Sequence, residues 1–138
     1  MAVLYRNYIV DILRGRKTVE CRLGRLGFPP HGIVRAGDVL WLKEVSGPVW
    51  AAVRVCGVRT VRLTGPEALE VVRRKWNDRI GAPAAYWRAG GNATAATLIL
   101  LGDCCSFQPF RVRKADRRAW VPLGRPRVPG RALCAAGR

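Results

Sequence analysis

Acidic residues are scarce in this chain of 138 residues, where nine Asp and Glu stand against 25 Lys and Arg and the formal net charge is +16. A surface of that sign attracts polyanions, and nucleic acid is the abundant polyanion inside cells, with anionic lipid headgroups a weaker competitor. Because 21 of the 25 cations are arginine, a GC-rich genome could account for the choice of Arg over Lys. It does not account for the shortage of acids, so the composition favours a nucleic-acid partner.

Histidine and paired cysteines are also lacking. His31 is the single histidine and lies in a Pro/Gly-rich loop, where an imidazole is more often a surface residue than a general base. Triads and metal sites built on histidine therefore have no support. The five cysteines form no C-x-x-C pair, so no zinc site, other metal or cofactor is expected; they are Cys21, Cys56, Cys104, Cys105 and Cys134.

Long apolar runs and glycine-rich phosphate motifs are missing. No apolar run approaches the roughly 20 residues of a membrane span, and the N-terminus lacks the charged-then-apolar pattern of a signal peptide. We therefore expect a cytoplasmic protein with reduced thiols and no membrane partner. The absence of G-x-G-x-x-G, P-loop and G-x-S-x-G patterns removes the usual support for a glycine phosphate loop and for serine hydrolysis.

The sequence nevertheless has the means to fold, since 49% of its residues are hydrophobic. The length fits one domain, which we place at residues 1–123, with the positive charge on its surface. Residues 124–138 are rich in Pro, Gly and Arg and are predicted to form a basic tail with little fixed structure. The stretch from Arg111 to Arg138 holds nine cations and one acid, which would add sequence-independent affinity for phosphates; a solvated tail without a partner is the alternative.

Periodicity predicts an α+β fold. Apolar residues recur at helical spacing over Tyr5–Leu13, which Gly15 would end. Strands are expected at Lys17–Leu23, Val39–Lys43, Val49–Val55 with a continuation to Leu63, Ala93–Leu101 and Phe107–Val112, the last two separated by a turn at Gly102–Asp103, with an edge segment at Trp120–Leu123. Further helical stretches are Glu67–Ile80 and Ala82–Arg88, and Gly24–Gly32 reads as a long loop. Short strands with two or three helices and no regular βαβ rhythm indicate a small barrel or strongly curved sheet.

One short segment, Gly15–Arg22, gathers polar residues of several kinds. Three cations, Arg16, Lys17 and Arg22, accompany the hydroxyl of Thr18 and the carboxylate of Glu20. In a strand, the period of two residues would put Thr18, Glu20 and Arg22 on one face, where they could hold a polar anionic ligand. Two alternatives stay open: an exposed edge strand whose charges serve solubility, and an ion pair of Glu20 with Lys17 or Arg22.

The order and spacing of several motifs resemble an ASCH domain over about residues 5–123. The matching segments are the helix before Gly15–Arg22, then Gly37–Lys43, Gly47–Val49, Tyr86–Trp87, Ala96–Leu98 and Asp116–Trp120. The resemblance implies a small PUA-like β-barrel, a fold associated with RNA-binding proteins, with a basic cleft lined by the G-x-K-T-x-E-x-R segment. It also implies that Lys43 occupies a position that the family tends to keep cationic.

This resemblance leaves activity open, because the wider family includes an N4-acetylcytidine amidohydrolase and proteins reported to bind or cleave RNA. Lys17 matches the lysine of the amidohydrolase type, but Glu20 stands where its threonine nucleophile would align. If the protein is an enzyme, Lys17, Thr18 and Glu20 are the candidate catalytic residues, acting in a ribonuclease or an N4-acetylcytidine-type amidohydrolase. A basic subunit of a ribonucleoprotein is a further class.

The first hypothesis is an RNA-binding module for single-stranded RNA or a nucleotide. The cations would contact phosphates, Thr18 and Glu20 would read a base or ribose edge, and Tyr86 or Trp87 would stack on an unpaired base. The complete set of candidate nucleic-acid contacts is Arg16, Lys17, Thr18, Glu20, Arg22, Arg25, Lys43, Tyr86, Trp87 and Arg117.

Overall fold

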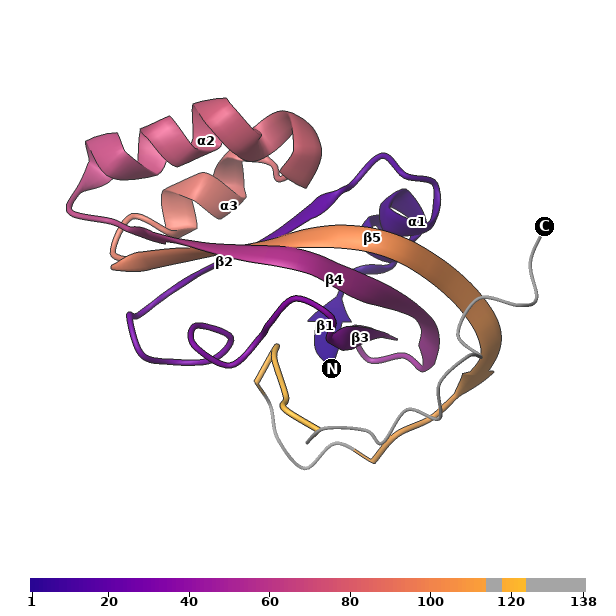
Figure 1. Cartoon of the computed structure of the whole chain (residues 1–138). Coiled ribbons are helices and arrows are strands. Elements are labelled where there is room, and N and C mark those ends of the chain that lie inside the picture. Colours follow the sequence, from indigo (N-terminus) through magenta and orange to yellow (C-terminus); the bar gives the residue numbers. More distant parts are fainter. Residues whose placement is uncertain (114–117, 124–138) are drawn as a thin grey trace.

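The computed structural model describes residues 1–113 and 118–123. They form one mixed five-stranded sheet, in the order β1-β3-β4-β5-β2, with three helices (Figure 1). In chain order the elements are β1 (Ala2–Leu4), α1 (Arg6–Leu13), β2 (Val19–Gly24), β3 (Val39–Glu44), β4 (Val49–Arg62), α2 (Pro66–Ile80), α3 (Ala84–Ala89) and β5 (Ala95–Phe110). The α+β architecture predicted from the sequence is confirmed, and each predicted helix is present within a few residues of its expected bounds.

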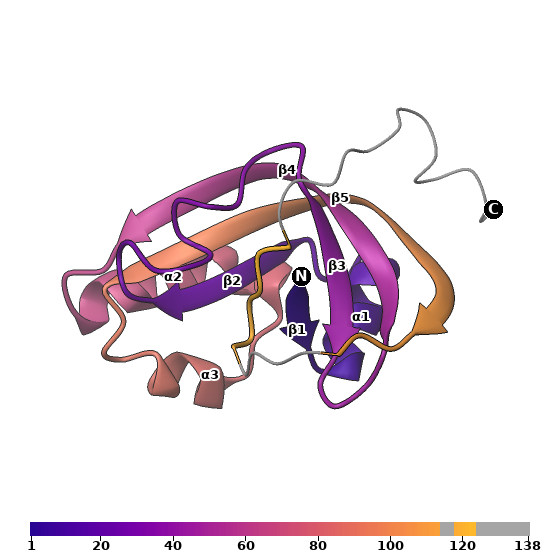
Figure 2. The same cartoon turned by 90° about the horizontal axis from the view of Figure 1, so that it is seen from below.

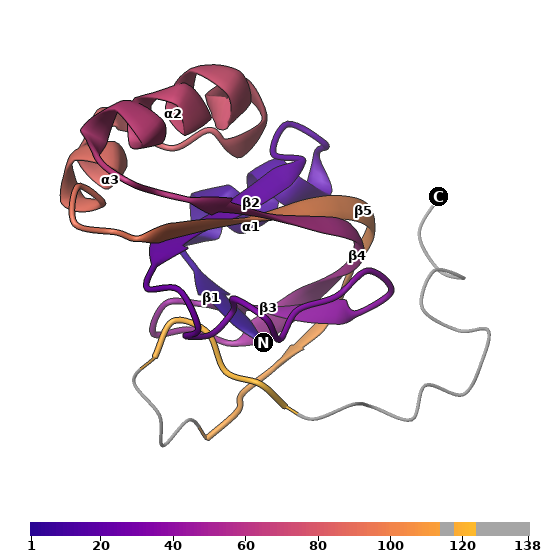
Figure 3. The same ribbon diagram turned by 60° about the vertical axis from the view of Figure 1, so that its left-hand side comes forward.

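Side-chain alternation along β2 and β5 divides the core in two. Val19, Cys21 and Leu98 belong to an outer core beneath α2 and α3, which lie together on one side of the sheet (Figures 1 and 3). Ile99, next to Leu98 in sequence, belongs instead to an inner core that α1 helps to close. Because neighbours in a strand point to opposite faces, one pair of strands serves both cores.

The strand predicted to stop at Leu101 continues to Phe110, so the turn expected at Gly102–Asp103 is wrong. The pairing of β4 with β5 shifts between Val53 and Val55, and this irregularity accommodates the two supposed turn residues without ending the ladder. A Cβ at Gly102 would lie 2.3 Å from Cys56 Sγ, so a larger residue there would require the exposed Cys56 side chain to move. The turn-forming pair instead marks a bend in a long strand.

The curved sheet is not closed into the barrel that the sequence predicted. Within the part of the chain that the structure describes, no backbone ladder joins β1 to β2, the two edge strands. The segment Ala119–Val121 runs along β1 instead, with a hydrogen bond of 2.9 Å from Val3 N–H to Ala119 O. Figure 2 shows this segment between β1 and β2. The predicted Trp120–Leu123 edge segment is thus represented by a single bridge between Trp120 and Ala2.

None of the described helices is both long and apolar enough to cross a bilayer.

Substitution of a buried residue of β5 tests this arrangement of the core. Leu98 is fully buried, so Leu98→Ala should lower the free energy of unfolding by about 2–5 kcal/mol through lost contacts and a residual cavity. Val71, on the exposed side of α2 at 63% exposure, provides the control: Val71→Ala should change it by less than about 0.5 kcal/mol. Urea denaturation measures both. Equal effects of the two substitutions would contradict the assignment of Leu98 to the core.

Candidate nucleic-acid site

A buried ion network lies on the inner face of β2. The strand alternation places Glu20 and Arg22 opposite Ile99 and Thr97 of β5, on the face away from α2. Glu20 is 5% exposed and so is Lys17, which precedes the strand. The expectation that Thr18, Glu20 and Arg22 share one face is therefore confirmed for Glu20 and Arg22 but wrong for Thr18, which precedes β2 and whose hydroxyl meets Arg79 of α2. The side chains of Glu20 and Arg22 both face the interior of the curved sheet, whereas the alternative interpretation left these charges exposed to solvent on an edge strand.

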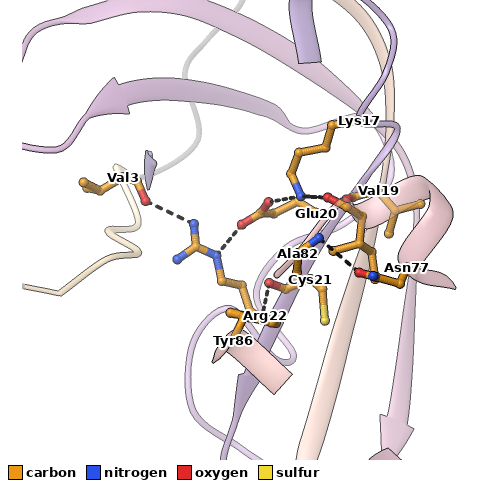
Figure 4. Close-up of polar contacts among 10 residues, drawn as sticks. Val3, Lys17, Val19, Glu20, Cys21, Arg22, Asn77, Ala82 and Tyr86 are labelled. Carbon is orange, nitrogen blue, oxygen red and sulfur yellow. Dashed lines mark hydrogen bonds and ion pairs between the residues drawn. The ribbon is translucent and has the colours of Figure 1, made fainter. Parts of the chain in front are cut away.

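The Glu20 carboxylate is held from both sides. Lys17 Nζ lies 3.1 Å from Glu20 Oε2, and Arg22 Nε lies 2.7 Å from Glu20 Oε1 (Figure 4). The ion pair predicted as an alternative for Glu20 is thus present with both partners. Since two cations share one carboxylate, the network carries a net charge of +1 beneath the surface.

Lys17 uses all its hydrogen-bonding capacity inside the fold. An ammonium has three N–H donors. Beyond Glu20, Nζ donates to Ile80 O at 2.7 Å and to Val19 O at 3.1 Å, and it lies 5.2 Å from the centroid of the Tyr8 ring. Ile80 ends α2, where the helix dipole favours a cation. Lys17 therefore fastens α2 to β2.

The side chain of Tyr8, on α1, lies next to the same network. Partial burial, followed by the negative charge of Glu20, raises the pKa of its phenol above the ordinary value. The phenol thus stays protonated and neutral over the physiological pH range. The Lys17 ammonium lies over the face of its ring.

Arg22 spans the gap between the two edges of the sheet. One of its terminal nitrogens, Nη2, donates to Val3 O of β1 at 3.2 Å. The guanidinium also lies 5.6 Å from the Trp120 ring, on the segment that runs along β1. Its Nε is committed to Glu20, so the side chain is fixed at three points and the Nη1 end remains for other contacts.

A cavity of about 270 Å³ opens beside Arg22. Its walls come from β2, the 24–32 loop, the start of β5 and the 118–120 segment, and the lining residues are Arg22, Leu23, Gly24, Arg25, Phe28, Pro29, Pro30, His31, Ala95, Thr97, Arg118, Ala119 and Trp120. Three of these are arginines and none is acidic. The cavity is therefore a concave surface at which positive charge gathers.

Several lining residues suit ligand contact. Phe28 is 61% exposed, which leaves its ring open to a planar group. Thr97 is 2% exposed, and its hydroxyl has no hydrogen-bond partner among residues 1–113 and 118–123. His31 Nδ1 accepts a hydrogen bond of 2.8 Å from Gly27 N–H, which places the proton of the neutral ring on Nε2. A donor, a hydroxyl and an aromatic face thus accompany the arginines.

Three of the predicted site residues outside the network lie away from this cavity. Arg16 pairs with Asp11 at 2.6 Å on the surface. The Thr18 hydroxyl accepts a hydrogen bond of 3.1 Å from Arg79 Nε, on the α2 side of the sheet. Lys43, which is 8% exposed, donates to Glu44 O and Gly47 O at 3.0 and 2.8 Å and so stabilises the β3–β4 turn.

The two aromatic residues predicted to stack on a base lie in the packing between α3 and β2. Trp87 is 5% exposed, and its Nε1 donates to Asn77 Oδ1 at 3.2 Å. Tyr86 Oη donates to Cys21 O at 2.7 Å. Of the remaining predicted contacts, Arg25 lines the cavity together with Arg22, and Arg117 lies outside the described residues.

Sequence reasoning missed Phe28, Thr97, Arg118 and Trp120 as cavity residues. The signal for Phe28 was its place in the Gly24–Gly32 loop, flanked by Gly27 and Pro29, where a large apolar side chain has little core to enter. Thr97 carried a weaker signal as one of two threonines in the otherwise apolar run Ala93–Leu101. Trp120 gave none, because its neighbour β1 is too short to detect by alternation.

Comparison with solved structures shows which fold this is. The chain superposes on crystal structures of an ASCH protein from Zymomonas mobilis and of two of its mutants, with TM-scores of 0.62, 0.64 and 0.63 and sequence identities of 16–17%. Each match covers 80% of this chain and 71–73% of the other. This chain has the ASCH fold. No protein-family model matches the sequence, and no curated protein does.

The resemblance to an ASCH domain is thus confirmed for the fold, and Gly15–Arg22 is one of the segments on which that resemblance rested. In this chain the segment supplies a buried ion network whose last member, Arg22, reaches the cavity. At 16–17% identity the likeness concerns the fold alone, so the roles of the individual residues rest on the geometry described above.

Removal of the shared carboxylate tests the network. Glu20→Gln would leave Lys17 and Arg22 buried without a counter-charge and should lower the free energy of unfolding by about 3–5 kcal/mol. Glu70 of α2 is a matched control because it also pairs with two arginines but its side chain is 40% exposed, so Glu70→Gln should cost less than about 1 kcal/mol. Combining Lys17→Met with Glu20→Gln should cost less than the two single changes added. Strict additivity in urea denaturation would count against the network.

Burial also sets the reactivity of Cys21. Desolvation raises the pKa of its thiol from the ordinary value near 9 to about 11. The folded state favours the neutral thiol over the thiolate. This preference adds to the free energy of unfolding below about pH 9, and the added stability is lost as the pH rises toward 11. Burial likewise raises the pKa of the neighbouring Tyr86 phenol.

Alkylation distinguishes Cys21 from the exposed Cys56. At pH 8 in the native state, N-ethylmaleimide should modify Cys56 and leave Cys21 largely unmodified, because the thiolate is the nucleophile and Cys21 is both buried and protonated. Peptide mass spectrometry after timed quenching measures each rate. Modification of both thiols at one rate in the native protein, as expected in denaturant, would refute the burial of Cys21.

Proposed function

We propose that this domain binds single-stranded RNA and holds one nucleotide of the strand in the cavity beside Arg22. The observation that carries the proposal is the convergence of Arg22, Arg25 and Arg118 on one concave surface, where the lining contributed by residues 1–113 and 118–123 includes no acid. The net charge of +16 supports a polyanionic partner. We propose that this polyanionic partner is a cytoplasmic RNA.

The size of the cavity favours an unpaired nucleotide. A volume of about 270 Å³ lies near the lower end of ligand pockets and is far too small for a duplex. Sequence-specific RNA recognition usually targets splayed bases of single strands, which stack on aromatic side chains. We assign this stacking to Phe28, whose ring is exposed at the cavity, in place of Tyr86 and Trp87.

Each polar residue of the cavity then has a distinct role. Arg25 and the free Nη1 end of Arg22 bind phosphate or a base edge, and the Thr97 hydroxyl supplies a hydrogen bond at the buried wall. Lys17 and Glu20 act through Arg22: they fix its direction and do not touch the ligand. We propose binding without hydrolysis, because the Thr18 hydroxyl is engaged by Arg79 and Lys17 has no spare donor.

Loss of the stacking ring tests the cavity. Phe28→Ala should weaken binding of a fluorescein-labelled single-stranded RNA by about 5- to 150-fold, the range expected for one base–aromatic contact. Phe110, another exposed phenylalanine at 43% exposure that lies outside the cavity, gives the control Phe110→Ala, for which no change is expected. Fluorescence anisotropy at several salt concentrations measures both. The proposal fails if the unsubstituted protein binds RNA no more tightly than ~10 µM at low salt, or if both substitutions weaken binding equally.

A further inference from the structure

A second group of cations lies on the outer face of the sheet. Arg59 of β4 and Lys75 and Arg79 of α2 all lie over the ring of Trp76, with their charged groups 5.7, 6.0 and 5.5 Å from its centroid. All three cations are exposed, whereas Trp76 is 8% exposed beneath them. We name these four residues the Trp76 cluster.

The Trp76 cluster lacks the counter-charge that other cations of α2 have. Arg73 and Arg74 both pair with Glu70, at 3.0 and 3.2 Å. By contrast, within the described ranges no carboxylate lies at ion-pair distance from Lys75, Arg79 or Arg59, and Asp78, next to Arg79 in sequence, makes no ion pair with them. Like charges at positions i and i+4 of a helix repel each other. The fold therefore keeps an unneutralised concentration of positive charge here.

The cluster is also held in place. Arg79 Nε donates to Thr18 Oγ1 at 3.1 Å, and Thr18 N–H donates to Arg79 O at 3.0 Å. The Trp76 ring orients the same guanidinium from below, and its terminal nitrogens are left for other partners. A cation that is already positioned loses less conformational entropy when it binds an anion.

The Trp76 cluster and the cavity lie on opposite faces of the sheet, at the part of β5 around Thr97 and Leu98. Arg59 pairs in register with Leu98, which faces the outer core, while the adjacent Thr97 lines the cavity. Pairing of β3 with β4 extends only to Arg54, so the Arg59 end of β4 forms an edge of the sheet. In Figure 1 α2 lies above this end of β4. A single nucleotide cannot touch both sites, but a strand that passes this edge can.

We propose that the Trp76 cluster is a second RNA contact, which binds phosphates of the strand without reading its sequence; this inference rests on the proposed RNA-binding function. Each cation lies within about 6 Å of one centroid, so any two are at most about 12 Å apart, a footprint that neighbouring phosphates of one strand can fill. The ring lies beneath the cations and presents little apolar surface to insert into a lipid layer. RNA is therefore a better fit than a membrane.

A matched pair of double variants on α2 tests the cluster. Lys75→Gln with Arg79→Gln removes two cations of the cluster, and Arg73→Gln with Arg74→Gln removes two cations that share Glu70 as their counter-charge. With a labelled single-stranded RNA of about 20 nucleotides, the first variant should reduce the slope of log K against log salt by about 1.4, while the second should change it by much less. Thermal unfolding checks that both are folded, and the charge-retaining Lys75→Arg with Arg79→Lys should keep the original slope.

Each result separates this inference from the cavity. If both double variants alter the slope equally, or neither does, the Trp76 cluster is not an RNA contact, and the cavity stands or falls on Phe28→Ala. If Phe28→Ala has no effect while Lys75→Gln with Arg79→Gln weakens binding, the cluster stands and the cavity does not. Should the cluster variant lose affinity only for vesicles containing phosphatidylserine, the surface binds a membrane and the inference is overturned. Absence of RNA binding by the unsubstituted protein overturns both.

Discussion

The pairing of one buried carboxylate with two cations is the interaction on which the rest of this structure depends. Transfer of charged groups out of water costs several kcal/mol for each ion, and the cost is offset only when every charge finds a partner. Glu20 meets this requirement by accepting Lys17 on one oxygen and Arg22 on the other. The same contacts connect β2 to the end of α2 through Ile80 and to β1 through Val3. The direction of Arg22, and with it the character of the cavity, follows from this pairing.

Glu20 and Thr18 show how one short segment can serve two faces of a sheet. Glu20 lies within β2 and faces inward, while Thr18 precedes the strand and meets Arg79 on the helical side. The Gly15–Arg22 segment therefore contributes to both candidate RNA contacts, but through different residues. Two of its cations also differ in role. Lys17 donates all its hydrogen bonds within the fold, whereas one end of the Arg22 guanidinium is available at the cavity.

Patterns of hydrophobic residues predicted the elements of this fold well where alternation or helical spacing extended over many residues. The α2 helix and the common inner face of Glu20 and Arg22 are examples. Prediction failed where a decision depended on a distant partner. Gly102 and Asp103 have the composition of a turn, yet an irregular register with β4 keeps them in the strand. The three residues of β1 carry no detectable period of their own, and the Ala119–Val121 segment that runs beside them is equally short.

Packing with distant partners also decides where the predicted site residues lie. Residue types near Gly15–Arg22 indicated an anion site, and Arg22 and Arg25 do line the cavity. Which aromatic side chain faces that cavity depends on packing: Trp87 finds a hydrogen-bonding partner in Asn77 and is buried, whereas Phe28 has no such partner and stays exposed. Likewise, Lys43 resembles a phosphate ligand in sequence, but two nearby carbonyls take up its donors.

The 118–120 wall of the cavity sets an order of events during synthesis on the ribosome. All the groups that satisfy the Glu20 network have been made once the chain has reached Ile80. Trp120, by contrast, emerges some 40 residues later and pairs with the second residue of the protein. Contacts this far apart along the chain are slow to form. Because β2 pairs only with β5 in the described sheet, enclosure of the ion pairs also waits for residues made after Ile80, and the 118–120 wall of the cavity is completed last.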